Sequence, residues 1–267
     1  PDIVALQEIQ DSDGAEITET VSAAMTLKRI CADIETAGGN RYAWLDLPPE
    51  VGADGGQPGG NIRNAFLYNP ARVLVREHSA SRLGENDPAF VDSRKPSLAQ
   101  FALQQNGERR SRWLSVVNVH LASKRKQHSI FAIQEPGHDP REAMRIAQAG
   151  VVRQHLLSLL ADEQEFYATG DFNDTEHSET LRALLGDDCC NMVERLPANQ
   201  RFDYNHRGKL HALMHAVVPL AMLRENRIEY EILHGNELLG VRPGELDRAQ
   251  KASDHAYVIA RIQPGDL

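Results

Sequence analysis

Apolar residues recur along the chain in two alternating patterns. Short runs of consecutive or alternating apolar residues, bounded by polar and Gly-rich segments, are typical of buried β-strands. The strands predicted in this way cover Asp2–Leu6, Ala65–Tyr68, Trp113–Ser123, Glu165–Thr169, Leu213–Val218 and His255–Ile262. Between several of them, apolar residues three and four positions apart predict amphipathic helices. This alternation of strands and helices predicts an α/β fold.

Two of the predicted helices carry signals for their ends. The apolar residues of the first, at helical spacing, are Leu27, Ile30, Cys31 and Ile34. The Gly-Gly pair at Gly38 predicts where it ends. The second has Asp139 as its N-cap residue and Pro140 at its first helical position, and Glu142 follows the cap by three positions, as in a capping box. We predict that this second helix runs to about Asp162.

Composition and length are those of one soluble globular domain. The Gly- and Pro-rich stretch Pro48–Asn61 is too short to separate two domains, so we predict a single domain over residues 1–267. Hydrophobic residues make up 41% and charged residues 25% of the chain, which is ordinary for such a domain. The formal net charge of -9 argues against a protein that coats nucleic acid, but it leaves open an enzyme with a locally positive cleft. No apolar stretch approaches the ~18 residues of a membrane span, and the three cysteines allow at most one disulfide.

Polar and charged residues gather where the predicted strands end. Together they are Glu8, Asn118, His120, Asp171, Asn173, Asp254 and His255. Ligands of α/β folds often bind where strands meet loops. Carboxylates with an amide suit a divalent cation bound through oxygen, and Mg²⁺ takes one or two carboxylates together with water and substrate phosphate. The histidines are then free for proton transfer or for stabilising negative charge.

Each of these motifs alone also has a structural interpretation. Gly170-Asp171 is typical of a turn, His120 of a hydrogen-bonded core residue, and Glu8 of a solvated strand end. The combination of all the motifs, in this order, favours a functional site. A zinc site built from His206, His211 and His215 is a poorer interpretation. On a strand, the last two would lie about 13 Å apart, which is too far for bonds of roughly 2 Å to one zinc ion.

Four sequence motifs resemble those of the DNase I-like endonuclease/exonuclease/phosphatase superfamily. They are "PDIVALQEI", "VVNVHLASK", "ATGDFND" and "KASDHAYVIARI". Two further stretches, "GGNIRNAFLYNPARV" and "EAMRIAQAGVV", resemble its bacterial nuclease-like branch, many members of which are extracellular. The resemblance spans Pro1 to about Ile262. It implies a four-layer α/β/β/α sandwich, in which two mostly antiparallel sheets lie between helices, and an extracellular or cell-envelope location.

The resemblance also implies roles for single residues. Glu8 and Asp254 would hold the metal, with Mg²⁺ expected and Mn²⁺ or Ca²⁺ as alternatives. Asp171 and Asn173 would orient the attacking water and a phosphate oxygen. The two imidazoles, those of His120 and His255, would flank the scissile phosphate.

Basic and polar residues near these motifs are candidates for binding the substrate. They are Arg63, Asn118, Lys124 and Arg145. The planar donor forks of the two arginines suit phosphate. Lys124 would begin a basic rim with Arg125 and Lys126, for which a solvated turn is the alternative interpretation.

The implied activity is that of a metal-dependent phosphodiesterase, an endo- or exonuclease that hydrolyses DNA or RNA. The alternatives are a phosphatase or phospholipid-type diesterase with the same site, and a non-catalytic member that binds a phosphate-containing partner. We expect a nucleic-acid substrate, no obligate protein partner and a monomer.

Two departures from the family pattern bear on this interpretation. The family usually begins with a strand that carries an Asn beside the metal, and nothing precedes Pro1, so we expect that the domain lacks its first strand here. Relatives carry Asp-His in the strand where this chain has Met214-His215. In the family that Asp supports the imidazole matched by His255, which gives the hypothesis that Met214 makes the enzyme slow or differently specific. Asp203 is a candidate substitute carboxylate, although the family register places it one strand earlier.

Overall fold

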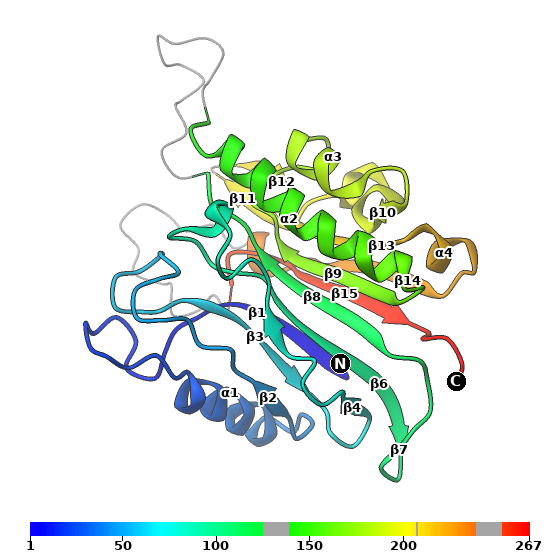
Figure 1. The fold of residues 1–267 in the computed structure, drawn as a ribbon, viewed down its shortest axis with the longest axis horizontal. Coiled ribbons are helices and arrows are strands. Elements are labelled where there is room, and N and C mark those ends of the chain that lie inside the picture. The colour runs from blue at the N-terminus through cyan, green and yellow to red at the C-terminus, as the bar shows by residue number, and fades with distance from the viewer. Residues whose placement is uncertain (125–138, 207, 239–252) are drawn as a thin grey trace.

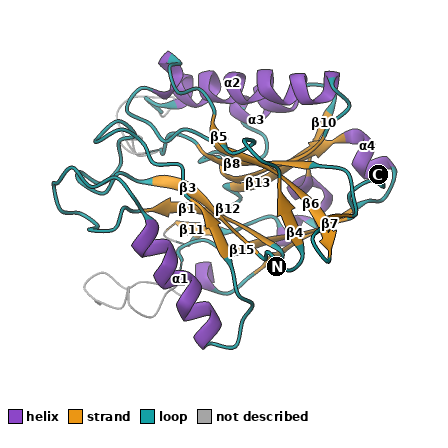
Figure 2. Cartoon of the chain, turned by 60° about the horizontal axis from the view of Figure 1, so that its bottom comes forward, coloured by secondary structure: helices purple, strands orange, loops and turns teal. Residues whose placement is uncertain are grey.

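The computed structural model describes residues 1–124, 139–206, 208–238 and 253–267 (Figure 1). Within these ranges the strands form two stacked layers, and helices cover the outer face of each layer (Figures 1 and 2). The predicted α/β/β/α sandwich is therefore confirmed. Arg125 and Lys126, two of the three residues of the predicted basic rim, lie outside the described residues.

The larger sheet has eight strands. Six of them follow the order β10 (Cys189–Asn191), β13 (Met214–Pro219), β9 (Glu165–Asp171), β8 (Leu114–His120), β6 (Ser97–Gln105) and β4 (Val73–Val75). The short strands β5 (Ser81–Arg82) and β7 (Glu108–Arg109) also pair with β6. Only β8 and β9 are parallel, and the other described pairs in this sheet are antiparallel. The parallel pair matters because it brings two strand ends to the same edge of the sheet.

The second layer is built from shorter sheets. One consists of β1 (Ile3–Ile9), β3 (Arg63–Tyr68) and β2 (Ala43–Leu45), in that order and antiparallel. Another is the antiparallel pair of β14 (Ile228–Leu233) and β15 (Tyr257–Ile262). A separate hairpin joins β11 (Tyr204–His206) to β12 (Lys209–His211).

Four α-helices and four short 3₁₀ helices are described. The α-helices are α1 (Ala24–Thr36), α2 (Glu142–Ala161), α3 (Glu179–Leu185) and α4 (Leu220–Arg224). The 3₁₀ helices are Pro88–Phe90, Met192–Arg195, Ala198–Gln200 and Asn236–Leu238. None of the described helices is long and apolar enough to cross a membrane.

The end of α1 is as predicted, but the start of α2 is not. Gly38 follows α1 with a φ of 84°, a left-handed conformation that Gly adopts without steric penalty. α2 begins at Glu142 and has no side-chain cap, so the prediction of Asp139 as its N-cap is wrong. The carboxylate of Asp139 instead accepts a hydrogen bond from the Arg141 amide and forms an ion pair with Arg145.

Three hydrophobic clusters fill the spaces between the four layers. One lies between α2, α3 and the larger sheet and includes Leu156 and Phe166. The second lies between the two sheet layers and includes Tyr167, and the third, between β1, β3 and α1, includes Leu27. Burial of one such large side chain contributes about 1.5–3 kcal/mol. Because alternate residues of β9 pack into the first two clusters, this strand and the residues at its end are fixed from both sides.

Candidate active site

Two neighbouring strand ends form the centre of the candidate site. Because β8 and β9 are parallel, His120 at the end of β8 lies opposite Asp171 at the end of β9. β9 reaches Asp171 rather than stopping at Thr169. Gly170 makes this close approach possible, since it has a φ of 135° and a Cβ atom there would lie 2.0 Å from the Val119 carbonyl oxygen.

The carboxylate of Asp171 lies between the two imidazoles of the site. Its Oδ2 atom is 3.6 Å from Nε2 of His120 and 3.9 Å from Nε2 of His255. Asn173 folds back on the same carboxylate, with its backbone N–H 2.7 Å from Oδ1 and its Nδ2 3.0 Å from Oδ2. The left-handed φ of 52° at Asn173 allows this turn. The structure thus brings all four predicted catalytic residues together.

The pKa values of Asp171 and His255 are both shifted upward. Burial raises the pKa of Asp171 to about 6, although the charge of His255 and the Asn173 N–H oppose the shift. For His255, burial favours the neutral ring, but the hydrogen bond to Asp203 and the negative charge of Asp171 outweigh it and raise the pKa to about 9. At neutral pH the site therefore holds a protonated imidazolium beside an ionised carboxylate.

Asp203 is the carboxylate that supports His255. Its Oδ2 atom lies 2.5 Å from Nδ1 of His255, and its Oδ1 atom accepts hydrogen bonds from the backbone N–H groups of Leu213 and Met214 at 2.6 and 2.9 Å. The Asp203 side chain is fully buried. It reaches the imidazole from the segment just before β11, rather than from β13. The premise that Met214 leaves His255 without a carboxylate is therefore wrong.

His215 has a structural role beside the site. Its Nδ1 lies 3.0 Å from Nδ2 of Asn191, and its Nε2 lies 2.8 Å from the Asp174 carbonyl oxygen. Since the amide can only donate and the carbonyl can only accept, this ring is neutral and carries its proton on Nε2. His211 ends β12 and His215 lies in β13, so the two histidines do not share one strand as the argument against a zinc site assumed.

Glu8 and Asp254, the two predicted metal ligands, line the same cavity as the catalytic residues. A β-bulge between Leu6 and Ile9 and a φ of 57° at Glu8 turn its side chain outward, where it is 69% exposed, with Oε1 4.0 Å from Nε2 of His120. In the part of the chain that the structure describes, no three His, Cys, Asp or Glu side chains cluster tightly enough to hold a metal by themselves. Two accessible carboxylates fit a hydrated cation such as Mg²⁺ and do not fit a structural zinc site.

The cavity has a volume of about 2320 Å³ and extends from the site along the free edges of β1 and β15. Of the predicted site residues it is lined by Glu8, His120, Lys124, Asp171, Asn173, Asp254 and His255. Within the described residues β1 pairs only with β3 and β15 only with β14. The prediction that the domain lacks a first strand stays a prediction.

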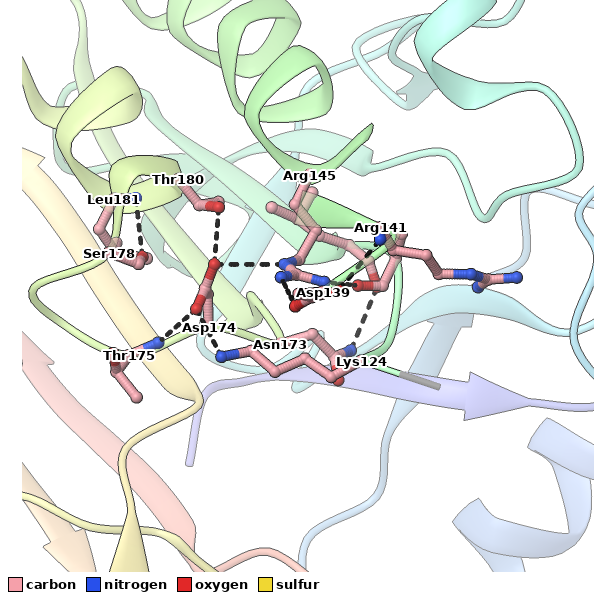
Figure 3. A network of polar contacts seen from close by, with 12 residues as sticks. Lys124, Asp139, Arg141, Arg145, Asn173, Asp174, Thr175, Ser178, Thr180 and Leu181 are labelled. Atoms are coloured by element: carbon pink, nitrogen blue, oxygen red, sulfur yellow. Dashed lines mark hydrogen bonds and ion pairs between the residues drawn. The ribbon is translucent and has the colours of Figure 1, made fainter. Parts of the chain in front are cut away.

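Three of the four predicted substrate-binding residues make their polar contacts within the protein, and for them the prediction is wrong. They are Arg63 and Arg145, and Asn118, which is described below. Arg63 is buried, with Nη1 3.1 Å from Asp46 and its other donors on the Asn61 carbonyl oxygen. Figure 3 shows Arg145 held in the same way, with Nε 3.2 Å from Asp174 and a second ion pair to Asp139. Neither guanidinium is placed to contact a substrate phosphate.

Asn118 joins the two sheet layers behind the site. Its Oδ1 accepts a hydrogen bond from Gln7 Nε2 at 2.6 Å, and its Nδ2 donates to the carbonyl oxygens of Leu6 and Ala65 at 2.9 and 3.0 Å. Because all three partners lie in β1 and β3, Asn118 fixes the strand that carries Glu8 rather than a substrate. Lys124, by contrast, lines the cavity, although its Nζ lies 2.7 Å from Asp174 (Figure 3).

Two further residues of the site carried no signal in the sequence. Arg94 is buried and lines the cavity, and its Nη2 lies 3.0 Å from the Leu121 carbonyl oxygen. Its positive charge is one of the influences that limit the rise in the pKa of Asp171. The ring of Tyr204 stacks on that of His255, with centroids 4.9 Å apart. Only the tertiary fold brings these residues to the site.

The sandwich and the acidic and imidazole site at its edge define a DNase I-like protein. Residues 1–255 match the Endonuclease/Exonuclease/phosphatase family, and the chain belongs to that family. A comparison with curated proteins gives no match.

Several solved structures share the fold at low sequence identity. Truncated Caenorhabditis elegans TDP2 is 16% identical, with a TM-score of 0.58 over 97% of this chain and 83% of that one. D. rerio TDP2 complexed with single strand DNA product is 15% identical, with a TM-score of 0.55 over 97% and 84%. Mannosyl-6-phosphatase Bt3783 of Bacteroides thetaiotaomicron is 16% identical, with a TM-score of 0.55 over 96% and 83%. At these identities the likeness concerns the fold.

Proposed function

We propose that this chain is a metal-dependent phosphodiesterase, and specifically a nuclease that hydrolyses DNA or RNA. The observation that carries the proposal is the position of Asp171 between His120 and His255, together with the buried Asp203 behind His255. This arrangement combines a carboxylate that can accept a proton from water with fixed donors for phosphate oxygens.

Hydrolysis needs an oriented water, stabilisation of charge on the phosphoryl oxygens and release of an alkoxide. Asp171, ionised at neutral pH, would accept a hydrogen bond from the attacking water, and the Asn173 amide would fix the carboxylate. The protonated His255 would donate a hydrogen bond from Nε2 to a phosphoryl oxygen, with His120 on the other side. Since its pKa is raised to about 9, His255 is suited to stabilise negative charge rather than to accept a proton. A divalent cation held by Glu8 and Asp254 would supply further neutralisation of charge at the phosphate.

A phosphatase is the second candidate function. Its support is the similarity of the fold to mannosyl-6-phosphatase Bt3783, and the same groups would serve a phosphate monoester. The non-catalytic alternative rested partly on Met214, and the contact between Asp203 and His255 removes that support.

The test is cleavage of supercoiled plasmid and of single-stranded RNA in Mg²⁺, in Mn²⁺ and in EDTA. We expect cleavage in either metal and none in EDTA. Asp171→Ala should lower the rate at least about 100-fold, since it removes the water-orienting carboxylate. Asp187→Ala, which removes an exposed carboxylate outside the cavity, is the matched control.

Absence of cleavage by the folded parent protein would contradict the nuclease proposal. Hydrolysis of mannose 6-phosphate or p-nitrophenyl phosphate by the same preparation would then favour the phosphatase. Inactivity on all of these substrates would favour a phosphate-binding protein without catalysis.

A further inference from the structure

The β11–β12 hairpin (Figure 1) lies beside the candidate site, since residues of both its strands line the cavity. Its register places Tyr204 opposite His211 and His206 opposite Lys209. Residues directly opposite each other in an antiparallel pair share a face, as do residues two positions apart on one strand. All four side chains therefore lie on one face, and all four line the cavity. Leu210 alternates to the other face and does not line it.

Aromatic rings on this face form a stack that begins at the candidate catalytic imidazole. The ring of Tyr204 lies 4.9 Å from that of His255 at an angle of 29°, and the ring of His206 lies 6.3 Å from that of Tyr204 at 18°. His206 is exposed, so the stack ends at the surface. Stacked rings of this kind are surfaces on which unpaired bases bind, because every base has a π-face.

The outer end of this face, at His206 and Lys209, carries positive charge on an acidic protein, whereas Tyr204 at its inner end lies near the carboxylates of Asp254 and Asp171. Lys209 is exposed, and none of the described carboxylates forms an ion pair with it. Burial lowers the pKa of His211, and the nearby positive charges of Lys124, His206 and Lys209 lower it further. Since the chain carries a formal net charge of -9, such a patch provides the local attraction that a polyanion needs.

We propose that this face of the β11–β12 hairpin binds single-stranded nucleic acid next to the scissile phosphate. A base would stack on His206, the exposed end of the stack, and a flanking phosphate would meet Lys209. The inference deepens the proposed nuclease function and rests on it, because it names the substrate class of the same site. A single strand is favoured over a duplex because the bases of a duplex are already stacked on one another.

The experiment measures binding of a short, fluorescently labelled oligothymidylate by anisotropy in EDTA, which prevents turnover, at several salt concentrations. We expect His206→Ala to raise Kd about tenfold through lost stacking. Lys209→Ala should weaken binding and lower the slope of log K against log salt by about 0.7, as expected for one lost phosphate contact on a single strand. Lys28→Ala on α1 and Leu210→Ala on the opposite face of the hairpin are the matched controls, since both side chains are exposed and neither lines the cavity.

Unchanged binding by the His206→Ala, Lys209→Ala double variant, or no binding by the parent, would overturn the inference. Thermal melting of each variant separates a binding effect from misfolding. The proposed function is judged separately by cleavage. Hairpin-dependent binding without metal-dependent cleavage would contradict the nuclease and leave the hairpin as a face that binds single-stranded nucleic acid. Cleavage by a protein whose hairpin variants bind and cut like the parent would support the nuclease and overturn the inference about the hairpin. Binding of mannose 6-phosphate, but not of the oligonucleotide, would assign the face to a sugar phosphate.

Discussion

At the scale of single residues, the candidate site depends on one imidazole held between two carboxylates. Asp203 contacts Nδ1 of His255 at 2.5 Å, while Asp171 faces its Nε2 at 3.9 Å. The first contact fixes the orientation and tautomer of the ring, and the second leaves a donor directed at the cavity. The backbone N–H groups of Leu213 and Met214 donate to Oδ1 of Asp203 and so hold that fully buried carboxylate in place.

This geometry predicts that Asp203, and not residue 214, controls activity. Asp203→Asn should lower kcat about 100-fold with little change in KM, because the amide cannot stabilise a charged imidazolium. Met214→Asp should not raise the activity of the parent, since Asp203 already occupies Nδ1 of His255 and a carboxylate at residue 214 would add negative charge beside Asp171. It should also not restore the activity of Asp203→Asn. The measurement is steady-state kinetics on bis(p-nitrophenyl) phosphate, with Asp187→Asn as control. A rate increase in Met214→Asp would show that His255 lacks an effective carboxylate in the parent.

At the scale of secondary-structure elements, the position of the site follows from how β8 and β9 end. The two strands run parallel with their backbones close together at Val119 and Gly170. A side chain on Gly170 would enter the space of the Val119 carbonyl, and its φ of 135° is one that L-residues rarely adopt. The alignment of His120 with Asp171 therefore depends on this one glycine.

Gly170→Ala should destabilise the protein by about 2 kcal/mol or more, through backbone strain and the clash with the Val119 carbonyl. Activity should also fall, because relief of the clash moves Asp171 away from His120. Gly107→Ala is the matched control, since Gly107 has a φ of 83° but a Cβ atom there would meet nothing within 4 Å. Urea denaturation of Gly170→Ala and Gly107→Ala measures the loss of stability in each variant. An equal loss in the two variants would rule out the clash as the cause.

The elements were predictable from the sequence to the extent that their signals are local. The apolar run before Asp171 predicted β9, and the Gly-Gly pair predicted the end of α1, because both depend on neighbouring residues. Glu8 and His255 were found through motifs at strand ends. Arg63 and Arg145 were misassigned because nothing in their sequence context shows that Asp46 and Asp174 neutralise them.

The origin of the carboxylate behind His255 could be settled only by tertiary structure. Asp203 and His255 lie far apart in the sequence, and their contact depends on how the segment before β11 packs against the start of β15. The sequence alone left open whether Met214 deprives His255 of its carboxylate or whether Asp203 supplies one instead. The hydrogen bonds from the backbone N–H groups of Leu213 and Met214, which hold Asp203 in place, decide this question.

At the scale of the whole molecule, four layers with three apolar interfaces support a cluster of buried charge. The stability of the molecule therefore responds to the protonation of the site. The raised pKa of Asp171, about 6 against 3.8, means that ionising this carboxyl favours the unfolded chain as pH rises from about 4 to about 6. The raised pKa of His255 acts in the same direction at higher pH.

The stability contributed by His255 should be fully present below about pH 6.5 and lost as pH rises through about 9, because the folded state binds the proton more tightly than the unfolded chain does. The two pKa values correspond to a loss on the order of 3 kcal/mol. Urea denaturation at about pH 6.5 and at about pH 9 measures this loss of stability. In Asp203→Asn the raised pKa has lost its main cause, so most of the difference should disappear, whereas the exposed His177→Gln should behave like the parent. A pH dependence that Asp203→Asn leaves intact would assign it to other groups and would mean that the buried ion pair does not hold the imidazolium in solution.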